Sequence, residues 1–208
     1  MQQATHQLLT HQKMLRNSFL FILLIFLSGC SNGNFLGNQQ VLQVHSLGPE
    51  ELLLHCDFNV LASLPSSGTE GELWATDIPL DLLESGNFES GQIIQMQVLW
   101  IPTPGKTPLA PTSTNITIKQ IIISGDESGV YVGAGYGWPT GSPQEGLSIH
   151  MEDATIELQS STLNFSDLLT PATMVGYIHA PADTTIARKL SAIAEQYTIN
   201  NTINNTKN

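Results

Sequence analysis

The segment 92–102 constrains the fold of this chain most. Its sequence, QIIQMQVLWIP, alternates apolar and polar side chains with a period of two residues. That period predicts a β-strand with one buried face, because successive side chains of a strand point to opposite sides. The strand expected here has an apolar and a polar face, formed by Ile94, Met96, Val98 and Trp100 and by Gln95 and Gln97.

Short runs of the same kind recur from Val41 onward and are separated by Gly, Pro, Asn and Ser. This texture predicts an all-β chain. The turn GDESG at 125–129 predicts a hairpin. The apolar positions change phase across Glu152-Asp153, which predicts a bulge or a turn there. We expect the run 51–64 to form a strand buried on both faces, whereas the periodicity of 73–83 fits either a strand or a helical turn.

The C-terminal part predicts one helix. Asp183 is a candidate N-cap, and apolar residues follow at helical spacing as far as Tyr197, which gives an amphipathic helix. The polar stretch 199–208 predicts a disordered tail. We therefore expect a single β-rich domain over 41–198, either an antiparallel β-sandwich or a partly closed barrel, with about seven to nine strands and one C-terminal amphipathic helix.

The N-terminus carries a short apolar run, FLFILLIFL at 19–27, after Arg16. A membrane-spanning helix needs about 20 apolar residues, while the core of a signal peptide needs about 7–15. The run ends in Leu27-Ser28-Gly29-Cys30, a branched apolar residue and two small residues before a cysteine. This motif resembles the lipobox of bacterial membrane lipoproteins, and the resemblance covers about the first thirty residues.

The lipobox resemblance implies that residues 1–29 are a cleaved signal peptide and that Cys30 receives the lipid. Met14 is an alternative start, since Leu15-Arg16 would then open a short basic region. The polar residues 30–40 predict a flexible tether after the lipidated Cys30. Ser31 stands where an inner-membrane retention signal would place Asp, so the resemblance implies the outer membrane in a diderm organism.

The charge of the chain excludes some partners. The net charge is −11, and a chain starting at Cys30 keeps five basic against 18 acidic residues, a net charge of −13. Such a surface repels nucleic acid and anionic lipid headgroups. We therefore expect no nucleic-acid partner, and we expect membrane attachment through the lipid on Cys30, with an envelope protein or a glycan as further partner.

His55-Cys56-Asp57 is the strongest candidate for chemistry, because it brings together a base, a nucleophile and an acid. On a strand, however, Cys56 points away from its two neighbours, which favours a buried structural thiol. A lipid on Cys30 would leave Cys56 unpaired, whereas a free Cys30 could form a disulfide with it. The single histidines and the acidic pairs lack the ligand number of zinc or calcium sites. We expect no catalytic residue, metal or cofactor.

Aromatic side chains are the best candidates for ligand binding: Tyr131, Tyr136 and Trp138, with Trp74 and Trp100. Alternation places Tyr136 and Trp138 on one face of their strand and three glycines on the other, Gly133, Gly135 and Gly137. A face of glycines permits close approach of another backbone, a large side chain or a ligand. The alternative is that the aromatic rings fill the core.

Two functions follow from these observations. The first is a non-catalytic envelope lipoprotein that acts as an interaction or scaffold protein. The alternative is a ligand-binding module, which would hold either a glycan on exposed aromatic rings or an apolar molecule inside an open barrel. Buried rings without a cavity would exclude the ligand module. An apolar cavity of a few hundred Å³ beneath the helix would favour a carrier.

Overall fold

A computed structural model describes residues 41–49, 51–64, 70–105 and 113–206, with side chains as far as Asn201. The signal peptide, Met14, Cys30 and the tether expected from the sequence lie outside these residues. The described chain forms nine strands and two helices. These are β1 (Val41–Ser46), β2 (Leu53–Cys56), β3 (Val60–Leu64), β4 (Gly71–Thr76), α2 (Leu80–Ser85), β5 (Ser90–Val98), β6 (Ile116–Ser124), β7 (Glu127–Ser142), β8 (Gly146–Ser161), β9 (Ala172–Ala180) and α3 (Thr184–Thr206).

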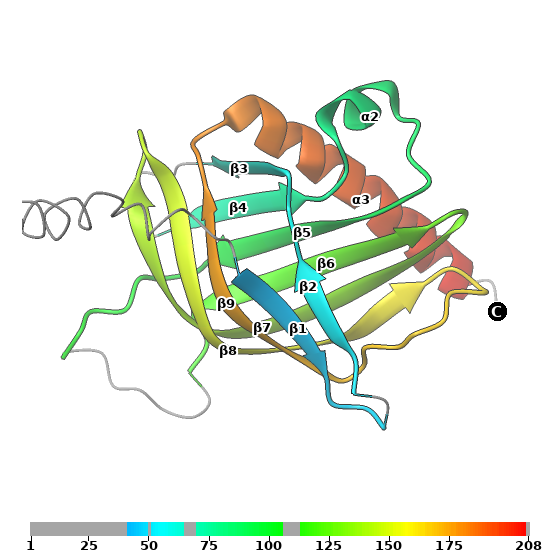
Figure 1. The fold of residues 1–208 in the computed structure, drawn as a ribbon, viewed down its shortest axis with the longest axis horizontal. Helices are drawn as coiled ribbons and strands as arrows, with labels where there is room; N and C mark the ends of the chain where they lie inside the picture. The colour runs from blue at the N-terminus through cyan, green and yellow to red at the C-terminus, as the bar shows by residue number, and fades with distance from the viewer. Residues whose placement is uncertain (1–40, 50, 65–69, 106–112, 207–208) are drawn as a thin grey trace, which may run out of the picture. The chain divides into compact units, whose positions relative to one another are not determined.

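The strands form one antiparallel sheet in the order β2-β1-β9-β8-β7-β6-β5-β4-β3. Figure 1 shows that this sheet curls into a half-barrel, with β1 and β2 in front of β5, β6 and β7. The all-β fold predicted from the sequence is confirmed, and it takes the form of a partly closed barrel. The hairpin predicted at 125–129 is also confirmed, because β6 and β7 pair directly across Gly125-Asp126.

The two edge strands of the sheet, β2 and β3, are consecutive in the chain. The run 51–64, expected as one strand, is broken at Asp57–Asn59. Its first part pairs with β1 and its second part with β4 at the far edge of the sheet. A parallel bridge between Ser63 and Ala182 ties this edge to the chain that follows β9. One uninterrupted strand could not pair with both edges, so the break is what lets the sheet curl.

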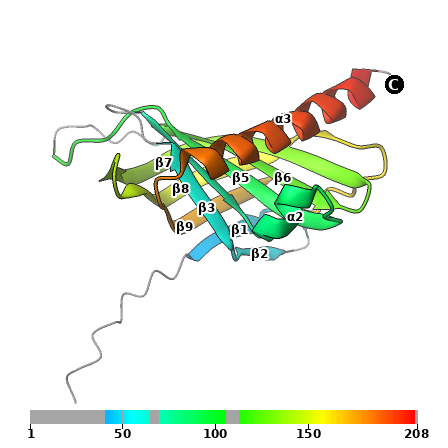
Figure 2. The ribbon, with the colours of Figure 1, turned by 90° about the horizontal axis from the view of Figure 1, so that it is seen from above.

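Each face of the sheet carries its own core. Inside the half-barrel, buried apolar side chains from nearly every strand pack together, among them Val44, Ile94, Met96 and Ile149. The alternation predicted for 92–102 is confirmed as far as Val98, since Ile94, Met96 and Val98 share this cluster. The strand ends at Val98, so Trp100, which was expected on the same face, lies outside it. The second core lies outside the barrel, where α3 crosses the outer face of the sheet from β3 to β8 (Figure 2). There, buried residues of the helix meet the outer side chains of the sheet: Ala187, Leu190 and Ala194 against Trp74, Ile93, Ile121, Ile123 and Val130.

The glycines of β7 allow the strand to approach β8 closely. A Cβ atom on Gly133 would lie 1.8 Å from the carbonyl oxygen of Thr155, and one on Gly135 would lie 2.2 Å from that of Asp153. The close approach predicted from the glycine face is thus made by a neighbouring backbone. The register of β8 also shifts between Met151 and Ala154, which confirms the predicted bulge. Together these features bend the sheet.

The helix α3 begins at the predicted N-cap. The Asp183 carboxylate accepts hydrogen bonds from the backbone N–H groups of Thr185 and Ile186, both at 3.0 Å. The helix continues to Thr206, so the expectation of a disordered tail from 199 is wrong as far as that residue. Asn201 gives the physical reason: it is fully buried, and its side-chain oxygen accepts a 3.1 Å hydrogen bond from the Ser128 hydroxyl.

Candidate functional site: a pocket at the open end of the barrel

A pocket of about 440 Å³ opens where the β6–β7 hairpin turns and β2 begins. The size falls within the range of about 300–1,000 Å³ that is usual for small-molecule sites. Its described lining includes no residue of α3, and Tyr131 and Leu169 in the lining belong to the inner core. The pocket therefore lies inside the barrel and not beneath the helix, where a cavity was considered from the sequence. The lining residues come from the start of β2, from the β6–β7 hairpin and from the loop between β8 and β9: Leu52, Leu54, Ile122, Ser124, Glu127, Tyr131, Asn164, Phe165, Ser166, Leu168 and Leu169.

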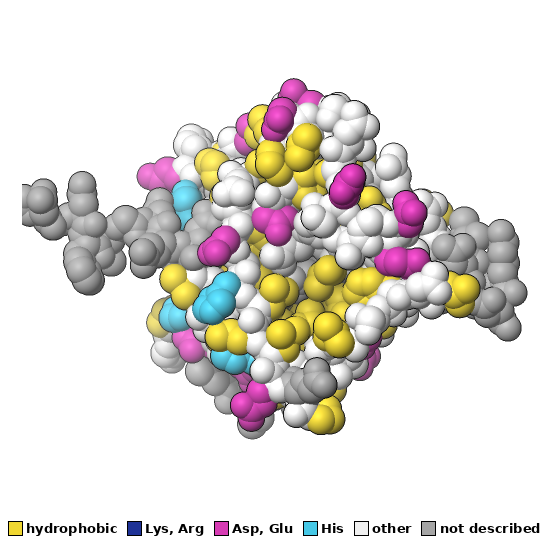
Figure 3. All heavy atoms as spheres, turned by 45° about the vertical axis from the view of Figure 1, so that its right-hand side comes forward, with side chains coloured by type: hydrophobic (Ala, Val, Ile, Leu, Met, Phe, Trp, Pro, Cys, Tyr) yellow, Lys and Arg dark blue, Asp and Glu magenta, His cyan; other side chains and the backbone are white. Residues whose placement is uncertain are grey.

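The pocket wall is mostly apolar. Leu54 and Ile122 are half-buried and pack against the inner core, to which the buried Leu169 belongs. At the rim, Leu52 and Leu168 are 41% and 59% exposed. Exposed leucines beside an apolar hollow indicate a binding surface, because covering them with another apolar group is favourable in free energy. Figure 3 shows hydrophobic side chains gathered in a hollow on this side of the molecule, with acidic side chains around it.

The loop 162–171 forms one wall of the pocket, and we refer to it as the strap. Its centre is held by Asp167. The Oδ1 atom of Asp167 accepts a 2.8 Å hydrogen bond from the phenol of Tyr131, inside the barrel. It also accepts the backbone N–H groups of Leu169 and Thr170, at 3.0 and 3.1 Å. Burial acts to raise the pKa of Asp167, but the hydrogen bonds outweigh it and hold this pKa below its usual value.

Glu127, the first residue of β7, holds the beginning of the strap. Its carboxylate accepts hydrogen bonds from the hydroxyl of Thr162 and from the backbone and side chain of Asn164, the last two at 3.2 and 3.0 Å. The hydrogen bonds from Thr162 and Asn164 lower the pKa of Glu127. Because its pKa is lowered, this carboxylate is ionised at neutral pH. It also lines the pocket.

The ring of Phe165 completes the wall. It lies edge-to-face with the ring of Tyr131, at a centroid distance of 6.3 Å. A Cβ atom on Gly129 would come within 2.3 Å of the Phe165 ring. The ring of Phe165 can therefore pack directly on β7 only because Gly129 has no side chain.

Polar side chains lie deeper in the barrel, on the same face of the sheet. Gln92 Oε1 accepts a 2.9 Å hydrogen bond from Gln120 Nε2 and a 3.8 Å contact from the Cys56 thiol. Gln120 pairs in register with Tyr131, and its Oε1 atom is buried without a hydrogen-bond partner. Beyond the apolar wall, the interior therefore has an acceptor with unused capacity.

Cys56 is a buried free thiol. Burial, with contributions from the carboxylates of Asp77 and Asp57, raises its pKa to about 12. His55 and Asp57 are exposed, on the other side of β2 from the thiol. The separation of base and nucleophile expected from strand geometry is therefore present. Within the described residues, no group of three or more His, Cys, Asp and Glu side chains is placed to hold a metal ion.

The candidate aromatic residues do not share one site. Tyr131 points into the barrel and lines the pocket, whereas Tyr136 and Trp138 are half-buried on the outer side of β7. Trp74 is buried under α3 and belongs to the outer core. The ring of Tyr136 lies 6.3 Å from that of Trp100 and 5.5 Å from that of Trp138, at interplanar angles of 60° and 88°. Tyr136 is coplanar with neither, so these contacts do not build a flat platform for a sugar ring.

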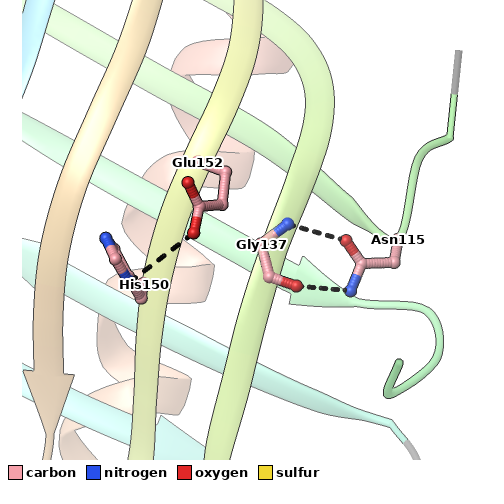
Figure 4. A network of polar contacts seen from close by, with 4 residues as sticks. All are labelled: Asn115, Gly137, His150 and Glu152. Atoms are coloured by element: carbon pink, nitrogen blue, oxygen red, sulfur yellow. Dashed lines mark hydrogen bonds and ion pairs between the residues drawn. The ribbon is translucent and has the colours of Figure 1, made fainter. Parts of the chain in front are cut away.

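Asn115 fixes the strand beneath these rings (Figure 4). Its side chain donates a 2.9 Å hydrogen bond to the carbonyl of Gly137 and accepts one of 2.9 Å from the N–H of the same residue. It also donates to the Trp100 carbonyl at 3.2 Å. The same view shows His150 and Glu152, which lie 3.9 Å apart on β8. Since Asn115 is fully buried and its amide is occupied, this group is structural.

Sequence reasoning found Tyr131 and missed the rest of the pocket. Glu127 lies in the predicted turn 125–129, where an acidic residue is ordinary, and Asp167 and Phe165 lie in a stretch without periodicity. A local signal existed for Asp167. An Asp whose carboxylate accepts hydrogen bonds from the backbone N–H groups two and three residues later is a common turn motif. The meeting of the strap with β2 depends on the curl of the whole sheet, for which the sequence carries no local signal.

Comparisons with protein-family models, with curated proteins and with solved structures find no match to this chain. In the part of the chain that the structure describes, no helix has the length and apolar character needed to cross a bilayer.

Proposed function

We propose that this protein is a bacterial envelope lipoprotein whose half-barrel binds a small, mostly apolar molecule. The single observation that supports this function most is the apolar pocket of about 440 Å³ at the open end of the barrel. Filling such a pocket removes its leucine, isoleucine and phenylalanine side chains from water. The favourable free energy is about 25 cal/mol per Å² of apolar surface buried. Ligand binding is thus preferred here over the interaction or scaffold role, which remains the alternative prediction.

A binding role fits the polar groups of the pocket better than a catalytic one. The phenol of Tyr131 is held by Asp167, and burial, together with this carboxylate, raises its pKa. It therefore stays protonated, while Glu127 and Asp167 stay ionised at neutral pH. General acid–base chemistry needs a group whose pKa lies near the operating pH. The groups described at this pocket hold the strap and orient a ligand.

The lipid anchor is the second part of the proposal. Cys30 in the lipobox-like Leu27-Ser28-Gly29-Cys30 would carry the acyl chains and hold the domain at the membrane. Ser31 favours the outer membrane if the organism is diderm. Incorporation of radiolabelled palmitate tests the anchor: we expect labelling of the wild-type chain and none of Cys30→Ser. Continued labelling of that variant would refute the assignment.

The pocket is tested with Nile red, a neutral apolar dye that fluoresces on entering an apolar site. The full chain carrying Cys30→Ser should bind it in a saturable manner. Leu54→Arg places a charge in the pocket wall and should weaken binding at least tenfold. Leu53→Arg is the matched control, since Leu53 is the neighbouring residue on the other face of β2 and is 43% exposed. Equal affinity of the two variants would show that the dye binds elsewhere.

A further inference from the structure

The charge of the pocket carries information about the ligand. Glu127 is ionised and lines the pocket, and Asp167 lies behind Tyr131 in the same wall. The described basic residues are Lys119, Arg188 and Lys189, and none of them lines the pocket. Lys119 lies on the outer side of β6, and Arg188 and Lys189 lie on α3. Among the side chains that Figure 3 draws in colour, this side of the molecule likewise shows acidic groups and no Lys or Arg.

From this arrangement we infer that the pocket takes amphiphiles with a cationic head, such as an alkylammonium, and discriminates against fatty acids. The inference rests on the proposed function, because it names the class of ligand for the same pocket. An apolar tail would lie among Leu54, Ile122 and Phe165, and the head would lie at the mouth beside Glu127.

The hydrogen bonds of Glu127 leave room for such a head. A carboxylate has about four lone-pair positions. In Glu127, hydrogen bonds from Thr162 and Asn164 occupy three of them. An ammonium group could donate to the remaining position and gain a charge-assisted hydrogen bond. A fatty-acid carboxylate would instead meet a like charge, and none of the described lining residues is a basic side chain that could neutralise it. Selectivity therefore comes both from attraction of the one head and from repulsion of the other.

Three probes of equal chain length test this inference: decylamine and decanoate below their micellar concentrations, and decanol below its solubility limit. Each is titrated against Nile red bound to the full chain carrying Cys30→Ser, at pH 7 and low salt. Decylammonium should bind about tenfold more tightly than decanoate, with decanol between them. The preference should shrink as salt is added, because the rim is open to solvent.

Glu127→Gln is the decisive variant, and Asp126→Asn is its matched control. Both remove one negative charge, but Asp126 lies in the hairpin turn and does not line the pocket. The preference for decylammonium should fall severalfold in Glu127→Gln and stay in Asp126→Asn. If decanoate displaces the dye as well as decylammonium does, the inference is overturned while the proposed function stands. If neither the dye nor any probe binds, the proposed function itself fails.

Discussion

The phenol of Tyr131 donates a 2.8 Å hydrogen bond to the carboxylate of Asp167, 36 residues further along the chain. Tyr131 comes from the middle of the sheet, and Asp167 lies at the centre of the strap. This bond therefore joins a rigid strand to the loop that walls the pocket. The shape of the proposed site depends on it, and several predictions concern this contact and its neighbours.

Tyr131→Phe removes the donor and leaves the ring in place. Hydrogen bonds to charged groups contribute about 1.5–3 kcal/mol, and Asp167 keeps its two backbone donors. We therefore expect a loss of about 1–2 kcal/mol in the free energy of unfolding, with faster amide hydrogen exchange across the strap. Chemical denaturation and exchange measurements check this. Tyr177→Phe is the control, because its 3.2 Å bond to Ser148 lies on the outer face, and its strap should exchange as in the wild type.

Gly129→Ala tests the seat of Phe165. The added Cβ would overlap the Phe165 ring, and overpacking of this kind costs about 1–3 kcal/mol. In a Phe165→Ala background the same substitution meets no ring, so its cost should be much smaller. The two changes should thus be strongly coupled in a double-mutant cycle of unfolding free energies. Additive effects would mean that the ring does not lie on Gly129.

Acid should release the strap. The pKa values of Glu127 and Asp167 are held below their usual values in the folded state. A carboxyl group with a lowered pKa stabilises the fold above its unfolded pKa, and this stabilisation is lost as the pH falls through the folded pKa. Exchange of the strap amides should therefore rise relative to the barrel core below about pH 4. Asp167→Asn should remove part of this pH dependence, and an unchanged profile would contradict the role given to Asp167.

Cys56 should be inert in the native protein. A buried thiol whose pKa is raised to about 12 forms almost no thiolate at neutral pH, and the thiolate is the reactive species. In the full chain carrying Cys30→Ser, iodoacetamide should label Cys56 only after unfolding. Mass spectrometry of the labelled chain measures this. Rapid native labelling would instead favour the nucleophilic thiol that the His55-Cys56-Asp57 sequence first suggested.

Asn115→Ala should destabilise the far end of β7. The substitution leaves the N–H and C=O groups of Gly137 without their partner, and each buried unsatisfied group costs about 1–3 kcal/mol. We expect an overall loss of about 2–4 kcal/mol. Asn59→Ala is the control, since its side chain makes one exposed 3.3 Å bond and should cost little. Thermal unfolding of both variants checks the difference.

The sequence predicted what local patterns determine. The alternation around Ile94 and Met96 identified a strand and its buried face, and Asp183 identified the start of α3, because both signals act within a few residues. The end of α3 was placed too early, since its last turns are stabilised by a contact between Asn201 and Ser128 that local polarity does not reveal. The break at Asp57–Asn59 was missed for a similar reason, because it depends on which distant strands each part pairs with.

The candidate site divides in the same way. Tyr131 was identified because an aromatic residue among glycines stands out in the sequence. Glu127, Asp167 and Phe165 were not, because their importance depends on one loop lying against the open end of the barrel. A pocket formed by segments from 52 to 169 is a property of the tertiary fold, and no spacing in the chain encodes it.

The most direct test of the central claim is to locate a bound ligand by methyl NMR. A titration of the full chain carrying Cys30→Ser with decanol should shift the methyl signals of Leu54, Ile122 and Leu169, which line the pocket. The signals of Ile186 and Ile193, which pack between α3 and the outer face of the sheet, should not move. Shifts confined to the residues beneath α3, or no saturable shift at any methyl group, would contradict the proposal that the open end of the barrel is a binding site.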